Sequence, residues 1–146
     1  MIMKPRIRQR ATRWVAPTSS GGVIALGLDL IEILRIRRLL KKEGDRFLAR
    51  VFTPAEAAYA RTKAAPAEAL AARFAAKEAV MKALGTGWGK GVGWTQIEVI
   101  RSKDGAPAIR LTGAAARRAK ALGIRRWLVS LTHTAGTAGV VVIGLG

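Results

Sequence analysis

An α+β fold in one main domain is predicted by three features of the sequence. The chain has 146 residues and half of them are hydrophobic, which is enough to bury a core without covalent or metal cross-links. Helical and extended patterns are mixed along the chain, with a hairpin pattern between helices. The last twenty residues carry no formal charge and contain the run Val140 to Ile143, which predicts buried strands.

The first part of this domain is expected to be one strand followed by four helices. Residues 23–30 are apolar except for Asp29, which is typical of a buried strand with an acid near its end. Gly44 is a suitable stop for the first helix, and Thr53 followed by proline is a strong start signal in which Glu56 completes a capping box. The expected helices cover residues 32–43, 45–52, 54 onward and 66–84.

The second part is expected to contain a hairpin, one helix and a final pair of strands. Gly85 is typical of the residue that ends a helix, and Asp104-Gly105 is a typical hairpin turn. A turn at Ala135-Gly136 separates the two last strands. The hairpin strands cover residues 95–101 and 107–111, the helix covers 113–122, and the last strands cover 126–132 and 137–143.

Positive charge dominates the composition. Lys and Arg number 26 against nine Asp and Glu, for a formal net charge of +17. Residues 1–20 hold five of the cations and no acid, so the main domain, residues 21–146, still carries +12. We expect residues 1–20 to be a disordered, dispensable extension. A surface this basic attracts anionic partners, among them nucleic acid, anionic lipid, phosphorylated ligands and acidic proteins.

Composition also excludes or disfavours several kinds of site and partner. Without cysteine the chain has no disulfide, thiolate metal site or cysteine nucleophile, and it fits a reducing cytoplasm. A non-enzymatic nucleic-acid-binding domain is the main alternative, but aromatic residues make up only 5% and no recognised motif is present, so we expect no nucleic-acid partner. Four glycines interrupt the uncharged C-terminal segment, so we expect strands there and no membrane span.

Asp29 is the first candidate for chemistry. A carboxylate at the end of an apolar strand needs a partner, because an unpaired buried charge is costly. The side chain is either a metal ligand or the N-cap of the helix that follows, and its position alone favours the cap.

A cluster of charged residues lies on the longest predicted helix. Lys77 falls within its apolar stripe, Glu78 lies at the edge of that stripe, and Lys82 follows Glu78 by one turn. Each residue alone has an ordinary explanation, as a surface ion pair or as a lysine whose ammonium reaches solvent. Together with Arg73, and leading into a glycine-rich loop at residues 85–93, they favour a phosphate site.

Two further features suit an anionic ligand. The glycine-rich loop lets backbone N–H groups approach an anion, although it lacks the P-loop motif and a mobile linker is the alternative. His133, the only histidine, lies near the end of a predicted strand with a threonine on each side, and a hydrogen-bonded structural residue is the alternative. One histidine without cysteine cannot form a zinc site.

A basic stripe follows Asp29 on the first predicted helix. Arg35, Arg38 and Lys42 are spaced by three and four residues, and apolar residues lie beside them. Such a stripe is usually a solvated face, and the alternative is a docking surface for an acidic helix of a partner.

Four sequence blocks resemble the holo-acyl-carrier-protein synthases, the small bacterial branch of the 4′-phosphopantetheinyl transferases. The resemblance covers residues 22–143, and its third block is highly specific. Gln96 stands where this family commonly has an acid. The blocks are Ile24 to Leu30 (IALGLDL), Arg50 to Glu56 (RVFTPAE), Arg73 to Gly87 (RFAAKEAVMKALGTG) and Ser130 to Thr134 (SLTHT).

This resemblance implies an enzyme that transfers the 4′-phosphopantetheine arm from coenzyme A to a serine of apo acyl carrier protein and releases adenosine 3′,5′-bisphosphate. Asp29 and Glu78 match the family's metal ligands. The implied ion is Mg²⁺, which usually takes one or two carboxylates and fills its other positions with water and phosphate oxygens. Glu78, or a water beside it, would accept the serine proton, and Lys82 would assist the leaving phosphate. The implied catalytic set is Glu78, Lys82 and His133.

The resemblance also implies the partners. It places the basic stripe of Arg35, Arg38 and Lys42 in the helix that docks the acidic carrier protein. It implies a homotrimer with each active site between neighbouring subunits, and a fold with helices packed on a mainly antiparallel sheet. An enzyme of another type that uses the same metal pair on a phosphate ligand is the second alternative. The residues that would contact or position the coenzyme A phosphates are Arg73, Lys77, Gly85, Thr86, Gly87, Thr132 and His133.

Overall fold

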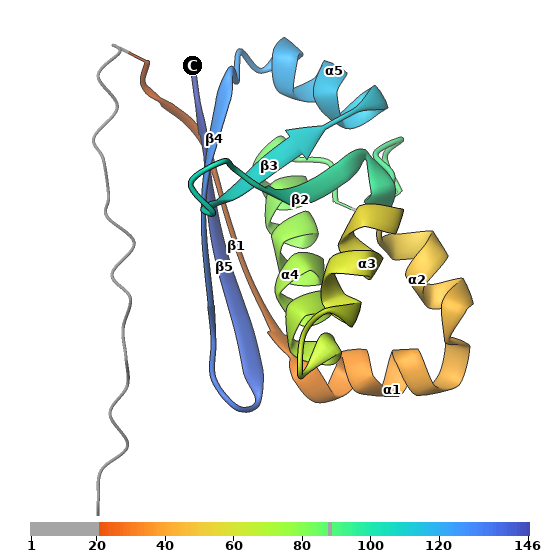
Figure 1. Cartoon of the computed structure of the whole chain (residues 1–146). Helices are drawn as coiled ribbons and strands as arrows, with labels where there is room; N and C mark the ends of the chain where they lie inside the picture. Colours follow the sequence, from red (N-terminus) through yellow and green to blue (C-terminus); the bar gives the residue numbers. More distant parts are fainter. Residues whose placement is uncertain (1–20, 88) are drawn as a thin grey trace, which may run out of the picture.

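The computed structural model describes residues 21–87 and 89–146, and the predicted extension, residues 1–20, lies outside the described residues. Helices and antiparallel strands are combined as the α+β prediction requires (Figure 1). In chain order the elements are β1 (Val23–Glu32), α1 (Ile33–Glu43), α2 (Asp45–Val51), α3 (Pro54–Arg61), α4 (Pro66–Leu84), the 3-10 turn η1 (Trp94–Gln96), β2 (Ile97–Arg101), β3 (Pro107–Leu111), α5 (Gly113–Ala121), β4 (Arg126–His133) and β5 (Thr137–Leu145).

The main sheet has the order β1-β5-β4 and is antiparallel throughout, so β1 and β4 are its two edges. Asp29 on β1 pairs with Val140 on β5, which pairs with Leu131 on β4. Side chains alternate between the two faces. Gly27 and Asp29 belong to the buried face that packs on α4, whereas the leucines between and beside them are exposed.

Helix α4 lies between the main sheet and the other helices and is mostly enclosed, although Lys82 near its end is exposed (Figure 1). Residues 73–77 are buried one after another, which covers more than a full turn. The buried surface of this helix is therefore wider than the single apolar stripe that the sequence predicted. Small residues permit the close packing: a Cβ atom added to Gly27 would lie 1.8 Å from the carbonyl oxygen of Ala79.

Most predicted boundaries agree with the structure, because local signals set them. The capping box is confirmed, with Thr53 Oγ1 accepting from the Glu56 N–H at 3.2 Å and the Glu56 carboxylate accepting from the Thr53 N–H at 3.0 Å. Glu32 was predicted to be helical and instead ends β1. The helix expected over residues 45–52 begins at Asp45 as predicted, with Gly44 at its N-cap position.

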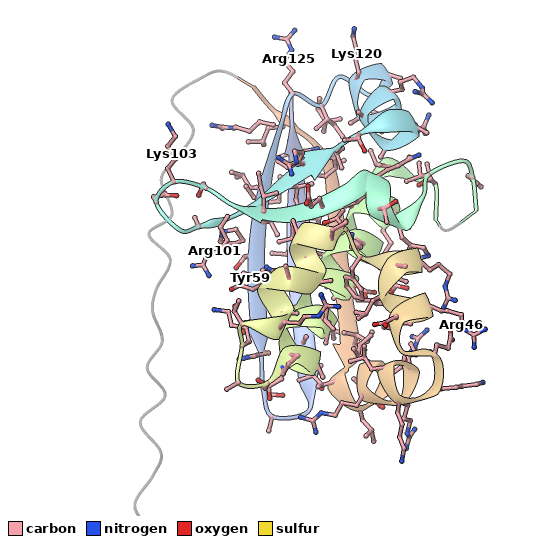
Figure 2. All side chains as sticks on the ribbon, turned by 45° about the vertical axis from the view of Figure 1, so that its right-hand side comes forward. Arg46, Tyr59, Arg101, Lys103, Lys120 and Arg125 are labelled. Atoms are coloured by element: carbon pink, nitrogen blue, oxygen red, sulfur yellow. The ribbon has the colours of Figure 1, made fainter. Side chains whose placement is uncertain are left out.

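The uncharged C-terminal segment forms β4 and β5 joined by a tight turn, as predicted. Among the described residues, no helix combines the length and the apolar character that crossing a membrane requires. Cations project into solvent from several elements, including Arg46 on α2, Lys103 in the β2–β3 turn, Lys120 on α5 and Arg125 before β4 (Figure 2). The positive charge is therefore spread over many elements.

Candidate active site

Two carboxyl groups that are distant in sequence meet where β1 packs on α4. Asp29 is only 7% exposed, and Glu78 is half-buried. After burial, the Asp29 carboxyl is the main influence that raises the pKa of Glu78, so the two carboxyl groups lie close to each other. The structure thus brings together the two residues that the resemblance identified as metal ligands.

Asp29 is held by Lys82 and is not a helix cap. Lys82 Nζ donates to Asp29 Oδ1 at 2.7 Å and to the Leu28 carbonyl oxygen at 3.0 Å. Glu32 occupies the N-cap position of α1, so the cap interpretation of Asp29 is wrong. Asp29 Oδ2 is buried and has no hydrogen-bond partner within residues 21–87 and 89–146. One oxygen of a buried carboxylate is therefore left to accept a ligand.

The proximity of the two acids changes how Glu78 titrates. Burial first, and then the Asp29 carboxyl beside it, raise the pKa of Glu78 to about 7, although Arg35 and Lys82 act in the opposite direction. Two carboxylates that share one site repel each other when both are ionised. A cation between them would relieve this repulsion.

The donors fit a hard divalent cation. Carboxylate oxygens are the preferred ligands of such ions, and Mg²⁺ needs only one or two of them when water and phosphate complete its shell. No cluster of three or more His, Cys, Asp or Glu side chains is present in the described part of the chain, so a site enclosed by protein ligands alone is not formed there. The open coordination positions would face solvent and substrate.

The repulsion predicts a pH-dependent stability of the metal-free protein. Because the pKa of Glu78 is raised in the folded state, its stabilising effect is complete below its ordinary pKa of 4.5 and is lost as the pH rises through about 7. With a chelator, Glu78→Gln should therefore unfold at the same temperature as the wild type near pH 4.5 and at a higher temperature at pH 8. The expected gain is roughly 2–4 °C for each kcal/mol of repulsion relieved.

A thermal unfolding series from pH 4.5 to pH 8 tests this expectation. Glu43→Gln is the matched control, because the Arg50 hydrogen bond lowers the pKa of Glu43 and its loss should give the opposite trend. A Glu78→Gln gain that does not vary with pH would contradict the repulsion between the two acids.

Arg35 lies closer to the acid pair than the sequence suggested. Its guanidinium carbon is 5.7 Å from the centroid of the Phe74 ring, and its charge acts to lower the pKa of Glu78. The predicted docking residues Arg38 and Lys42 are exposed on the same helix. Arg35 therefore connects the basic stripe to the acid pair, which helical spacing alone could not show.

A second group of predicted residues lines a groove of about 460 Å³ between α3, α4 and β4. Arg73, Thr132 and His133 contribute to it. So do Tyr59 on α3 and Lys63 in the loop after that helix, which the sequence did not indicate as site residues. The Arg73 guanidinium carbon lies 3.9 Å from the Tyr59 ring centroid, and burial lowers the pKa of Arg73.

Lys77 faces neither the acid pair of Asp29 and Glu78 nor the groove between α3, α4 and β4. It is fully enclosed, and its ammonium forms an ion pair with Glu56 at 2.7 Å and donates to the carbonyl oxygens of Trp94 and Ile97. An enclosed ammonium offers no direct contact to a phosphate, and the other half of the expectation, that Lys77 helps to position the phosphates, stays a prediction. Taken alone, Lys77 had the ordinary explanation of a lysine that extends to solvent, because the sequence does not show that its buried partner is Glu56 on another helix.

The glycine-rich loop and His133 lie at opposite ends of α4. Gly85 ends the helix in a left-handed conformation, and the N–H and hydroxyl groups of Thr86 bond back to the Met81 carbonyl oxygen. His133 Nε2 is 3.8 Å from Glu68 on the first turn of α4. The rise of a helix separates Glu68 from Gly85 by roughly 25 Å. One chain therefore does not assemble the whole predicted set.

Comparison with a family model gives an independent view of the chain. Residues 25–132 match the model described as the 4′-phosphopantetheinyl transferase superfamily. Over 122 residues the chain is 48% identical to a holo-[acyl-carrier-protein] synthase of Solibacter usitatus, covering 82% of this chain and 98% of that protein. It is 49% identical over 125 residues to the protein of the same name from a Methylobacterium species, covering 83% and 93%.

Solved structures show the same fold. The holo-[acyl-carrier-protein] synthase of Neisseria meningitidis superposes with a TM-score of 0.77 at 32% identity, covering 84% of this chain and 98% of that one. The Helicobacter pylori protein of that name, solved in complex with coenzyme A, gives a TM-score of 0.72 at 32% identity over 82% and 98% of the two chains.

Proposed function

The chain belongs to the 4′-phosphopantetheinyl transferase superfamily, and we propose from this premise that Asp29 and Glu78 jointly hold the divalent cation of its reaction. The reaction is the transfer of 4′-phosphopantetheine from coenzyme A to a serine of apo acyl carrier protein, with adenosine 3′,5′-bisphosphate as the second product. The predictions of fold, family and enzymatic activity are thereby confirmed.

One observation carries the proposed metal site: the buried, unpartnered Oδ2 atom of Asp29 lies beside the half-buried carboxyl group of Glu78 within the described structure. We propose Mg²⁺ as the ion, because two carboxylates with open positions suit its preference for water and phosphate oxygens. When bound, the ion would neutralise and orient the pyrophosphate of coenzyme A. We also propose a cytoplasmic location, which the cysteine-free sequence fits.

Glu78 and Lys82 are suited to handle charge and protons during the transfer. The Glu78 carboxylate, or a water beside it, would accept the proton of the attacking serine. Lys82 is exposed and hydrogen-bonded to Asp29, so its ammonium lies where it can stabilise negative charge on the leaving phosphate. His133, Thr132 and Arg73 would contact the phosphates of coenzyme A from the groove that they line.

A carrier-protein mass-shift assay tests the proposed function. The purified chain is incubated with coenzyme A, apo acyl carrier protein and Mg²⁺, and the carrier should gain the mass of one phosphopantetheine. Apo carrier protein in which alanine replaces the acceptor serine is the control and should not gain mass. A mass gain that persists in the presence of a chelator would contradict a role for a divalent cation.

A homotrimer would complete the site. The predicted catalytic residues are divided between the β1 edge, which holds Asp29, and the β4 edge, which holds His133. The face of β1 that points away from α4 is lined by exposed leucines, and apolar surface of this kind usually marks a protein contact. We propose that further copies of this chain cover this face, so that His133 of one copy approaches the acid pair of another. The exposed leucines are Leu26, Leu28 and Leu30.

Charge reversal on α1 should weaken carrier binding. In Arg38→Glu, the Michaelis constant for carrier protein is expected to rise roughly tenfold with little change in kcat, because a like charge would face an acidic partner. The salt dependence of this constant should also flatten. Arg117→Glu on α5 is the control, since this exposed arginine lies outside the basic stripe. An unchanged Michaelis constant for Arg38→Glu would show that the stripe is only solvated.

A further inference from the structure

We infer that the buried ion pair between Glu56 and Lys77 is a positioning device: it sets the rotation of α4 about its axis and so directs Glu78 toward Asp29. The inference rests on the proposed function, because its consequence is measured as the affinity of the acid pair for a divalent cation. Glu56 and Lys77 lie away from the acid pair and are positioning residues, not catalytic ones.

Lys77 ties α4 to three neighbouring segments. Its side chain has no exposed surface, and its ammonium lies 2.7 Å from Glu56 Oε2 on α3. It also donates to the carbonyl oxygen of Trp94 on η1, at 3.0 Å, and to that of Ile97 on β2. An ammonium has three donors, and all three are used within the interior.

Glu56 is equally constrained on its side of the pair. It is 1% exposed, and its Oε1 atom accepts from the Val99 N–H on β2 at 2.9 Å. Its Oε2 atom accepts from the Thr53 N–H at 3.0 Å through the capping box of α3. The carboxylate is therefore fixed by backbone groups of two elements before Lys77 reaches it.

Hydrophobic burial alone defines the rotation of α4 less sharply than that of a surface helix, which is oriented by one apolar stripe. Residues 73–77 of α4 are buried around more than a full turn, and several of its buried positions are alanines of equal size. Larger buried side chains such as Phe74 and Met81 favour one rotation through packing, but they carry no charge that requires a fixed partner. A buried charge with fixed partners, by contrast, is satisfied at one rotation only, because breaking the pair leaves a charge unpaired in the interior.

The direction in which the Lys77 side chain leaves the helix axis determines the direction of the Glu78 side chain, because the two residues are consecutive. Neighbouring helical positions differ by about 100° in direction, so a lysine held against α3 and β2 leaves Glu78 facing β1. A metal or catalytic site tolerates displacements of only about 0.5 Å. A small rotation of α4 would therefore separate Glu78 from Asp29 without unfolding the protein.

The test replaces the pair by neutral groups of similar size, Glu56→Gln with Lys77→Met, and measures Mn²⁺ binding by electron paramagnetic resonance on the full chain. The glutamine keeps a carbonyl acceptor, and uncharged replacements of buried pairs often fold well. We expect an unchanged circular dichroism spectrum, an Mn²⁺ dissociation constant raised at least about tenfold and a lower kcat. The Michaelis constant for carrier protein should not change.

Matched variants separate the possible outcomes. Glu43→Gln with Arg50→Met removes an exposed pair and should bind Mn²⁺ as the wild type does. A folded Glu56→Gln/Lys77→Met variant with wild-type Mn²⁺ affinity and kcat would overturn the inference. If that variant does not fold, Glu56→Asp decides, because it keeps both charges but shortens the carboxylate side of the pair by one methylene, and unchanged Mn²⁺ affinity would overturn the inference equally.

Failure of the proposed function is recognised separately. If Asp29→Asn binds Mn²⁺ as tightly as the wild type, the metal site itself is misplaced. If Asp29→Asn loses Mn²⁺ and Glu56→Gln/Lys77→Met does not, only the positioning role of the buried pair is wrong.

Discussion

Replacing Asp29 with asparagine is expected to abolish phosphopantetheine transfer while leaving the fold intact. The amide keeps the shape of the side chain and still accepts the Lys82 hydrogen bond, but it removes the negative charge from the Oδ2 position that we propose as a metal ligand. Metal-ion stabilisation of a developing charge amounts to several kcal/mol, so kcat/KM should fall at least about a hundredfold.

Two measurements distinguish loss of the metal from loss of structure. The wild type should gain thermal stability when Mg²⁺ is added at pH 8, whereas Asp29→Asn should not, because binding stabilises only a folded state that retains the site. Asp45→Asn changes an exposed carboxylate on α2 and should behave as the wild type. Wild-type turnover of Asp29→Asn at limiting Mg²⁺ would contradict the ligand assignment.

Introducing a charge on the outer face of β1 is expected to reduce phosphopantetheine transfer by a similar factor, through loss of subunit assembly. Leu28 is 58% exposed in the single chain and would be enclosed between subunits in the proposed homotrimer. In Leu28→Asp, burial of an unpaired carboxylate would oppose assembly, and subunits that separate lose the neighbouring His133. Sedimentation should then show the 15.6 kDa chain instead of a species of three times that mass, with little transfer.

Mixing variants tests the shared site directly. Asp29→Asn and His133→Ala should each be weakly active alone, since every interface then lacks one component. Hybrid oligomers of the two contain interfaces in which both components are intact, and transfer should partly return. Ala121→Asp, which adds the same charge on the exposed side of α5, is the control for Leu28→Asp. A trimeric, fully active Leu28→Asp variant, or mixtures without recovery, would contradict the shared site.

Local signals explain why so much of the fold was predictable. Proline after Thr53 and the acid three residues later begin α3 whatever surrounds it, because the capping hydrogen bonds join neighbouring residues. Gly85 ends α4 because its backbone adopts φ 69°, which glycine accepts without strain. The match of the RFAAKEAVMKALGTG block to a known family likewise required only the order of residues.

Contacts between distant residues were decided by the tertiary structure. Position along the chain favoured Asp29 as a helix cap, but packing of α4 against Gly27 places Glu78 beside it. The spacing of Lys77 was compatible with a stem that extends to solvent, but Glu56 on another helix receives its ammonium in the interior. No pattern of neighbouring residues in the sequence indicates such pairs, because each of the two residues in a pair has an ordinary explanation by itself.

The sequence by itself determined the family and the positions of most helices and strands, because these depend on residue order and on interactions within a few residues. Only the tertiary structure decided which charged groups meet. In the structure, Lys77 is buried in the interior and Arg35 lies near the acid pair. His133 lies on the opposite edge of the sheet from Asp29. The physical reason is that the energies of burial and charge depend on three-dimensional neighbours, which chain order does not specify.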